Sequence, residues 1–160
     1  MRPRVLDHGY GVGPKLLFRL IRLVSGHPVP DAAKITFYRP DFYGTHMKKF
    51  THEAMRGRST WSVGDRELMA AYVPKINDSP FCVGAHAATA ARAYQDRERV
   101  AAVLADLDSA PIQEGLRATL GMLGFAFNTT DRLANAFAFE VLSQEGFEAG
   151  AKYLLERGYR

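Results

Sequence analysis

The sequence predicts an all-α protein. Apolar residues recur at helical spacing along most of the chain, and serines stand where helices should begin. No run of β-branched residues alternates with polar ones at period two. Hydrophobic residues make up 47% of the 160 residues and charged residues 24%, the balance of a globular chain. We expect residues 1–160 to form one helical domain, in which residues 1–30 are peripheral.

The first predicted helix runs from Lys15 to Val24 and is amphipathic. Apolar residues stand at positions 16, 17, 20, 21, 23 and 24, with Arg19 and Arg22 between them. The apolar stretch is far shorter than the roughly 20 residues that a membrane span needs. We expect this helix to dock onto the rest of the chain or onto a partner subunit rather than onto a membrane.

A second helix is predicted from Asp41 to Met55, with Gly57 as its C-terminal stop. Ser62 should open the next helix, because serine is a preferred N-cap residue. Asp65 follows three residues later, at the spacing of a capping box. We expect this helix to bend or end near Pro74, since proline cannot donate a helical hydrogen bond.

Ser79 and Pro80 predict the start of the following helix, because serine favours the N-cap and proline favours the first helical position. The helical pattern continues through several alanines to about Gln95. Further helices are predicted over residues 96–107, 113–123, 130–142 and 146–157. Together these segments account for most of the chain and leave no candidate strand.

Charge and cysteine content exclude several classes of function. The net charge is +4, from 21 basic and 17 acidic residues, and the basic residues are scattered rather than clustered as in a nucleic-acid-binding protein. The single cysteine excludes an intrachain disulfide and a multi-cysteine zinc site, and it suits a reducing compartment. We therefore expect a cytoplasmic protein with no membrane or nucleic-acid partner, no metal and no cofactor.

Cys82 is the residue most informative about chemistry. If Ser79 is the N-cap, Cys82 is the third residue of its helix, where the helix dipole and free backbone N–H groups favour a thiolate. His86 is one turn further on the same face and could take the thiol proton or pair with the thiolate. Glu67, on the preceding helix, could orient the imidazole or move its proton onward.

The spacing of these residues leaves other interpretations open. A buried cysteine is more often a small apolar residue than a nucleophile, and Glu67 could be a solvated or capping carboxylate. One cysteine, one histidine and one glutamate could also give three metal ligands. Zinc sites, however, usually have more clearly spaced cysteine and histidine pairs.

The segments Asp65–Leu68 and Ile76–His86 resemble the redox members of the alkylhydroperoxidase D-like and carboxymuconolactone decarboxylase superfamily. Those members carry a glutamate, then a cysteine after eleven intervening residues, a second cysteine after two more and a histidine after three more. The present chain keeps every spacing, with Ser79 in place of the first cysteine. The similarity is best over residues 40–95, and the segments 127–137 and 154–160 are similar to later parts of peroxidase-related members.

This resemblance implies an alkylhydroperoxidase D-like helical bundle that assembles as a homo-oligomer. It also implies a peroxidase-related, antioxidant oxidoreductase that acts on small hydroperoxides. By position, Cys82 would be the redox thiol, with Glu67 and His86 as the proton relay. Ser79 cannot form a disulfide, so the two-cysteine cycle is lost. A one-cysteine cycle remains, in which Cys82 becomes a sulfenic acid that an external thiol or lipoyl-type reductant must resolve.

Two further functions remain alternatives at this stage. The chain could be a catalytically inactive member that serves as an oligomeric scaffold or binds a small ligand. It could also be a lyase like the carboxymuconolactone decarboxylases, which work without the two-cysteine pair. The sequence offers little for the lyase, because no cluster of cationic residues stands out as a clamp for a dicarboxylate.

Overall fold

Helices are the regular secondary structure throughout the part of the chain that the computed structural model describes, residues 3–38, 40–123 and 134–158. The predicted all-α fold class is confirmed. The helices are α1 (Val5–His8), α2 (Val12–Ser25), α3 (Asp31–Tyr38), α4 (Pro40–Tyr43), α5 (Thr45–Arg56), α6 (Val63–Ile76), α7 (Pro80–Tyr94), α8 (Arg97–Ala105), α9 (Glu114–Leu123) and α11 (Gln144–Arg157).

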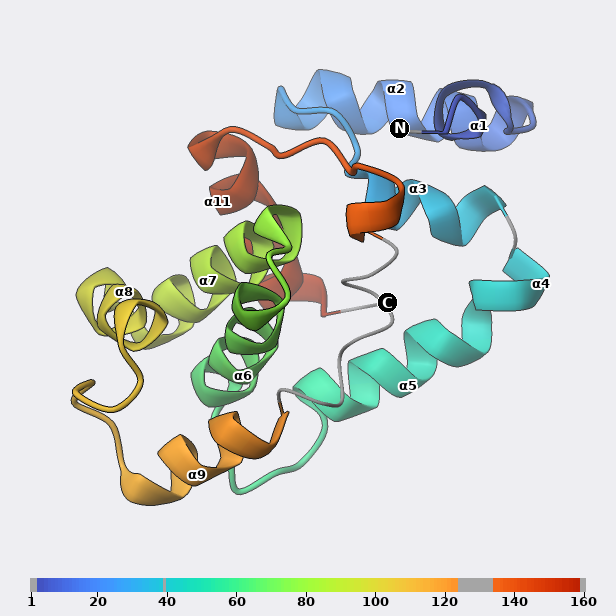
Figure 1. Ribbon diagram of the computed structural model, residues 1–160. Helices are drawn as coiled ribbons and strands as arrows, with labels where there is room; N and C mark the ends of the chain where they lie inside the picture. The colour runs from blue at the N-terminus through green and yellow to red at the C-terminus, as the bar shows by residue number, and fades with distance from the viewer. Residues whose placement is uncertain (1–2, 39, 124–133, 159–160) are drawn as a thin grey trace.

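Two helices, α6 and α7, form the centre of the molecule. A short connection joins them, and they pack along each other more extensively than any other pair of described helices. Helix α11 covers another side of α7, and α8 and α9 pack against the same central pair. Figure 1 shows α6 and α7 between these helices, while α1 to α5 extend around the opposite side. Residues on α6 and α7 are therefore the best shielded from solvent.

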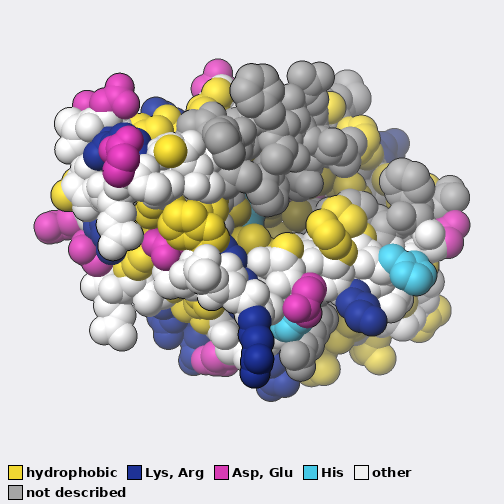
Figure 2. All heavy atoms as spheres, turned by 90° about the horizontal axis from the view of Figure 1, so that it is seen from below, with side chains coloured by type: hydrophobic (Ala, Val, Ile, Leu, Met, Phe, Trp, Pro, Cys, Tyr) yellow, Lys and Arg dark blue, Asp and Glu magenta, His cyan; other side chains and the backbone are white. Residues whose placement is uncertain are grey.

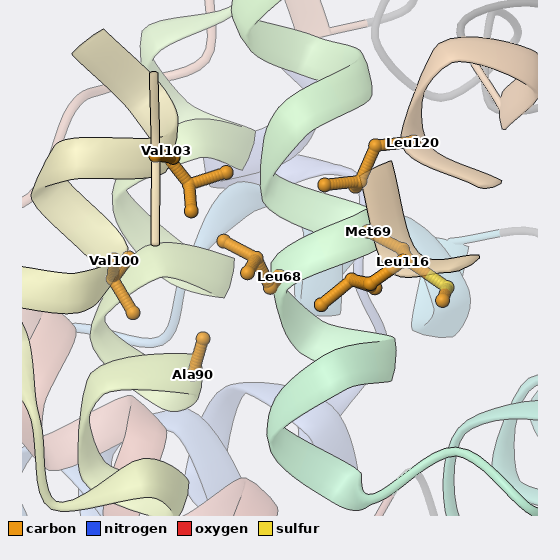
Figure 3. Close-up of a cluster of buried hydrophobic side chains, with 8 residues drawn as sticks. Leu68, Met69, Ala90, Val100, Val103, Leu116 and Leu120 are labelled. Atoms are coloured by element: carbon orange, nitrogen blue, oxygen red, sulfur yellow. The ribbon is translucent and has the colours of Figure 1, made fainter. Parts of the chain in front are cut away.

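The larger hydrophobic cluster lies between α6 and its neighbours α7, α8 and α9. Leu68 is fully buried and points toward Val100 and Val103 of α8, whereas Met69 lies beside Leu116 of α9 (Figure 3). Burying a side chain of this size stabilises a fold by about 1.5–3 kcal/mol. Consecutive residues of α6 thus anchor two different helices, which fixes the rotation of α6 about its axis.

A second cluster surrounds the first turns of α7. It is built from Leu6, Phe81, Cys82, Ala134, Phe139 and Phe147. Helix α11 comes close to α7 here because Gly84 has no side chain. A Cβ atom at Gly84 would lie 2.5 Å from the ring of Phe147, which is too close for any larger residue to be accommodated without a shift. Cys82 is therefore part of a packed apolar layer.

Several predicted helix boundaries are confirmed. Ser62 is the N-cap of α6 and forms the predicted capping box with Asp65. Helix α6 ends at Ile76, two residues after Pro74. Gly57 ends α5, and its N–H bonds the carbonyl of Glu53 at 2.8 Å. These local signals depend on a few neighbouring residues, which is why the sequence reveals them.

The predicted helix over Asp41–Met55 is wrong in one respect, because two helices occupy this segment. Gly44 separates α4 from α5 with φ of −71° and ψ of −119°, a conformation outside the helical region. A side chain at Gly44 would collide with the backbone of Pro40. Helix α3 was not predicted at all, although Pro30 accepts hydrogen bonds from the N–H groups of Ala33 and Lys34 at its start.

The predicted helix over residues 130–142 is also corrected. Residues 124–133 lie outside the described part of the chain, and so does most of the segment 127–137 that resembles peroxidase-related members. Residues 134–136 are helical, but Ala138 has φ of +45°, which ends the helix. The N–H of Phe139 then bonds the carbonyl of Ala134 at 3.0 Å, a closure typical of a helix C-terminus. This turn directs Phe139 into the second cluster.

Helix α2 is longer than predicted and rests on the molecule through few of its residues. Within α2 only Pro14 and Phe18 are half-buried, and the other residues are exposed. The ring of Phe18 contacts Tyr10 and Phe37 at centroid distances of 5.1 and 5.3 Å. Figure 1 shows α2 along one edge, away from α8 and α9. The expected docking onto the rest of the chain thus leaves most of the apolar face uncovered.

Hydrophobic side chains are also exposed elsewhere. Phe50 on α5 is 67% exposed, and Figure 2 shows further hydrophobic side chains open to solvent among charged ones on the face viewed from below. Within the described ranges, no helix combines the length and the apolar character that crossing a membrane requires.

Candidate functional site

A buried carboxylate on α6 is the centre of the site. The side chain of Glu67 is 0% exposed, and each of its oxygens has a partner. Oε1 accepts a hydrogen bond from Nη2 of Arg56 at 2.6 Å, and Oε2 lies 2.7 Å from Nδ1 of His86. Burying a lone carboxylate costs several kcal/mol, so these two partners are required for Glu67 to be ionised here. The contacts join α5, α6 and α7.

The charge state of Glu67 follows from its surroundings. Burial by itself raises the pKa of this carboxyl, but the hydrogen bond from His86 and the electrostatic attraction of His86 and Arg56 outweigh burial and lower the pKa below its ordinary value. Glu67 is therefore a carboxylate at neutral pH. Since a carboxylate only accepts hydrogen bonds, Nδ1 of His86 carries the proton in this contact.

Arg56 was not identified as a site residue from the sequence. It is in the last turn of α5, its side chain is only 10% exposed, and besides Glu67 it donates to the carbonyl of Leu154 on α11, with Nη2 at 3.2 Å and Nε at 3.3 Å. A further hydrogen bond goes to the carbonyl of Met55 at 2.8 Å. A buried glutamate signals that some cation must pair with it, but no spacing in the sequence indicates which one.

Cys82 and His86 share one face of α7, at positions four residues apart. Cys82 is 6% exposed and lies in the second cluster, whereas the side chain of His86 is 22% exposed. Because Nδ1 of His86 is turned to Glu67, its other nitrogen, Nε2, is the one that can exchange a proton with a thiol or a substrate. The glutamate and histidine singled out from the sequence are thus in direct contact.

Ser79 is at the predicted N-cap of α7, but its side chain does not cap the helix. It is 1% exposed, and Oγ is buried with no hydrogen-bond partner among the described residues. The backbone conformation explains why Ser79, unlike two other N-cap serines, does not cap its helix. Ser62 and Ser143, which cap α6 and α11, have ψ of 165° and 164°, whereas Ser79 has ψ of 84°. An unpaired buried hydroxyl costs about 1–3 kcal/mol, so Ser79 needs an explanation.

A pocket of about 300 Å³ opens at the first turn of α7. It is lined by Pro80, Phe81, Ala134, Asn135, Ala138 and Phe139. Three of these residues, Phe81, Ala134 and Phe139, also belong to the cluster that buries Cys82. The pocket is apolar apart from Asn135, whose Nδ2 donates to the carbonyl of Asn77 at 2.9 Å. An apolar small molecule is the kind of ligand that such a pocket accommodates.

A metal centre would need several ligating side chains close together. Within residues 3–38, 40–123 and 134–158, no group of three or more His, Cys, Asp or Glu side chains is arranged to hold a metal ion. The guanidinium of Arg56 lies against Glu67, and its positive charge would repel a metal cation there. The described side chains of the site offer proton transfer and thiol chemistry.

Comparison with known proteins places this site in a family. Residues 43–123 match the model of the carboxymuconolactone decarboxylase family, a span that includes Arg56, Glu67, Ser79, Cys82 and His86. The chain belongs to this family. The superfamily resemblance seen in the Glu67–His86 motif is confirmed, and the motif lies in the region that defines the family.

Among solved structures, the chain is similar to an uncharacterized peroxidase-related protein from Silicibacter sp. TM1040. The two are 21% identical, the match covers 90% of this chain and 92% of that chain, and the TM-score is 0.54. This similarity shows that the two proteins share a fold over nearly the full length of both chains. No match was found among curated proteins.

Proposed function

We propose that this chain is a peroxidase-related oxidoreductase that reduces small organic hydroperoxides through the thiol of Cys82. The observation that carries the proposal is the buried Arg56–Glu67–His86 chain of contacts, which holds a histidine one turn after Cys82. A cysteine that only packs in the core gains nothing from an ionised carboxylate buried next to a nearby histidine. An activated thiol does gain from it, because the histidine accepts the thiol proton and the carboxylate stabilises the resulting imidazolium.

The first step is the reduction of the peroxide. The thiol of Cys82 loses its proton to Nε2 of His86, and the imidazolium is stabilised by the Glu67 carboxylate at Nδ1. The thiolate sulfur attacks the terminal oxygen of the hydroperoxide, forming an S–O bond as the O–O bond breaks. The alkoxide takes the proton from His86 and leaves as an alcohol. The peroxide is reduced by two electrons, and Cys82 is oxidised to a sulfenic acid.

The second step needs a reductant from outside the chain, because Cys82 is the sole cysteine. A thiol of an external dithiol, such as a dihydrolipoyl group, attacks the sulfenic sulfur and releases water. The second thiol of that reductant then displaces Cys82 from the mixed disulfide. Cys82 returns to the thiol, and the reductant leaves as a disulfide. Resolution within one subunit, as in two-cysteine members, has no counterpart at Ser79.

The pocket beside α7 supports an organic rather than an inorganic peroxide. Its lining is apolar apart from Asn135, and it shares residues with the cluster around Cys82. The same lining disfavours a dicarboxylate, so we do not propose the lyase activity. Binding without turnover remains the second candidate, favoured by the low exposure of Cys82, which is 6%.

Self-association belongs to the same proposal. Five apolar residues of α2, Val12, Leu16, Leu20, Leu23 and Val24, are between 55% and 84% exposed. Monomers rarely expose a contiguous apolar patch of more than a few hundred Å². We propose that a second copy of this chain covers these residues of α2. Light scattering at micromolar concentration tests this self-association. A monomer would contradict the proposal. The cytoplasmic location stays a prediction.

Trapping the sulfenic acid tests the proposed activity. The protein is treated with cumene hydroperoxide in the presence of dimedone, and the intact mass is measured. We expect one dimedone adduct on the wild-type chain and none on Cys82→Ser, which keeps the size of the side chain. Cumene hydroperoxide should form the adduct faster than hydrogen peroxide does. A wild-type chain that stays unmodified would refute the peroxidase proposal and leave ligand binding as the function.

A further inference from the structure

The hydroxyl of Ser79 is a buried donor that the fold does not use. Its side chain is 1% exposed, and Oγ has no hydrogen-bond partner among the described residues. The backbone of Ser79 is fully engaged, since its N–H bonds the carbonyl of Pro74 at 2.9 Å and its carbonyl accepts from Val83 at 3.0 Å. Polar groups buried in this way are rare in native proteins, and a redox or catalytic role is one of the reasons for which they are kept.

The other helix of the central pair shows that the N-cap and the third helical residue can bring their side chains together. In α6, these residues are Ser62 and Asp65, and Oγ lies 2.7 Å from Oδ2. In α7, the same two positions are held by Ser79 and Cys82, but ψ is 84° at Ser79 and 165° at Ser62, so the Ser79 hydroxyl is not in the capping position. The buried hydroxyl and the sulfur thus belong to the same first turn, and a contact between them needs the Ser79 side chain to turn toward the sulfur.

We propose that the Ser79 hydroxyl donates a hydrogen bond to the sulfur of Cys82 once the thiol is ionised. The inference deepens the proposed function and rests on it only in taking the thiolate as the reacting species. A neutral thiol is a weak acceptor and gives Ser79 little reason to turn toward it. A thiolate is a charged acceptor, and hydrogen bonds to charged groups are roughly twice as strong as neutral ones.

The hydrogen bond complements the two other influences on the sulfur. The N-terminus of α7 presents backbone N–H groups and the positive end of its dipole to the third helical residue. His86 takes the thiol proton and is supported by Glu67, whose Oε2 lies 2.7 Å from Nδ1 of His86. Ser79 adds a donor that is already desolvated, so no water has to be displaced when the charge forms.

The rate of alkylation by iodoacetamide as a function of pH tests this role. Wild type, Ser79→Ala and Ser79→Thr are compared, and the pH at half-maximal rate is measured for each. We expect the midpoint of Ser79→Ala to rise by about one pH unit, which corresponds to about tenfold less thiolate at a given pH below both midpoints. Ser79→Thr keeps the hydroxyl and should retain the wild-type midpoint.

A midpoint in Ser79→Ala equal to that of wild type would overturn the inference. A raised midpoint that Ser79→Thr does not restore would overturn it as well, because it would indicate a packing effect. Ser62→Ala is the matched control. It removes the equivalent serine of α6, which touches Asp65 and not the thiol, so its midpoint should stay at the wild-type value. If Ser79→Ala fails to fold, Ser79→Gly replaces it in the same comparison.

This test is independent of peroxide reduction. Alkylation needs only the thiolate, whereas the dimedone adduct needs a peroxide to react. A shifted midpoint together with no dimedone adduct would retain the role of Ser79 and refute the peroxidase proposal. An unchanged midpoint together with a dimedone adduct would retain the peroxidase proposal and refute the role of Ser79.

Discussion

Helices α6 and α7 both begin with a serine, but the hydroxyls of the two serines lie in different surroundings. Ser62 is exposed, and its hydroxyl accepts from the N–H of Asp65 at 3.1 Å. Ser79 is buried, and its hydroxyl has no partner among the described residues. The third helical residue is a permanent anion in α6 and a thiol in α7. A serine at an N-cap thus completes the helix in α6, whereas in α7 its hydroxyl is left for the hydrogen bond to Cys82 that we propose.

The largest effect is expected when Glu67 loses its counterion, Arg56. Arg56→Ala removes the donor at 2.6 Å from Glu67 and leaves a fully buried carboxylate without this positive charge. We expect the free energy of unfolding at neutral pH to fall by about 3–5 kcal/mol, the usual cost of breaking a buried ion pair on one side. Urea denaturation followed by circular dichroism measures it.

The control for this variant is Arg97→Ala. Arg97 pairs with Glu148 while more than half exposed, so its loss should change stability by less than about 1 kcal/mol. If the two variants are equally stable, Arg56 is not the counterion on which Glu67 depends.

The next largest effect distinguishes the roles of Glu67 and Asp65, two carboxylates of α6, in the reaction. Glu67→Gln should slow formation of the sulfenic acid by about 100-fold or more, because the neutral amide no longer stabilises the imidazolium of His86. Asp65→Asn keeps Glu67 intact and should alter the rate less than twofold. The dimedone adduct measured against time gives both rates. Equal rates in wild type and Glu67→Gln would remove Glu67 from the reaction.

A smaller effect compares the serines as helix caps. Ser62→Ala should lower the free energy of unfolding by about 1 kcal/mol, the typical value of an N-cap. Ser79→Ala removes a hydroxyl that makes no hydrogen bond with the described residues, so it should leave stability unchanged or raise it. Thermal unfolding of the two variants is the measurement. A loss at Ser79 as large as that at Ser62 would show that both serines serve the helix.

The smallest effect is expected on the stability of the fold at acidic pH. The pKa of Glu67 is below its ordinary value of 4.5, because the His86 and Arg56 contacts outweigh burial. A carboxyl with a lowered folded-state pKa stabilises the fold fully above the unfolded-state value, and this contribution is lost as pH falls through the folded-state value. Unfolding curves from pH 5 downward should therefore show a loss of stability that is weaker in Glu67→Gln. An unchanged slope in that variant would contradict the assignment.

Much of the fold could be predicted from the sequence because its signals are local. The capping box at Ser62, the stop at Gly57 and the helix end after Pro74 each depend on residues within a few positions. The break at Gly44 and the turn at Ala138 were missed, since both depend on single backbone angles that the residue types do not dictate. The positive φ of Ala138 is unusual for a residue with a side chain.

For the candidate site, the sequence led to one contact that the structure contains, while the catalytic roles stay predictions. Glu67 and His86 were singled out together, and they lie 2.7 Å apart. Arg56 was missed because its link to Glu67 depends on how α5 packs, which no short-range pattern encodes. The state of the Ser79 hydroxyl was missed for a related reason. Serine at the N-cap implies a capping hydrogen bond, and only the observed ψ of 84° reveals that the bond is not made.

The hydrogen bonds from Arg56 to the carbonyl of Leu154 have a consequence for biosynthesis. The ribosome makes Arg56, Glu67 and His86 long before it makes Leu154. Until that carbonyl has left the exit tunnel, the guanidinium lacks one of its acceptors, and burying Glu67 is correspondingly less favourable. We therefore expect the nascent chain to keep the carboxylate hydrated until α11 packs against α7.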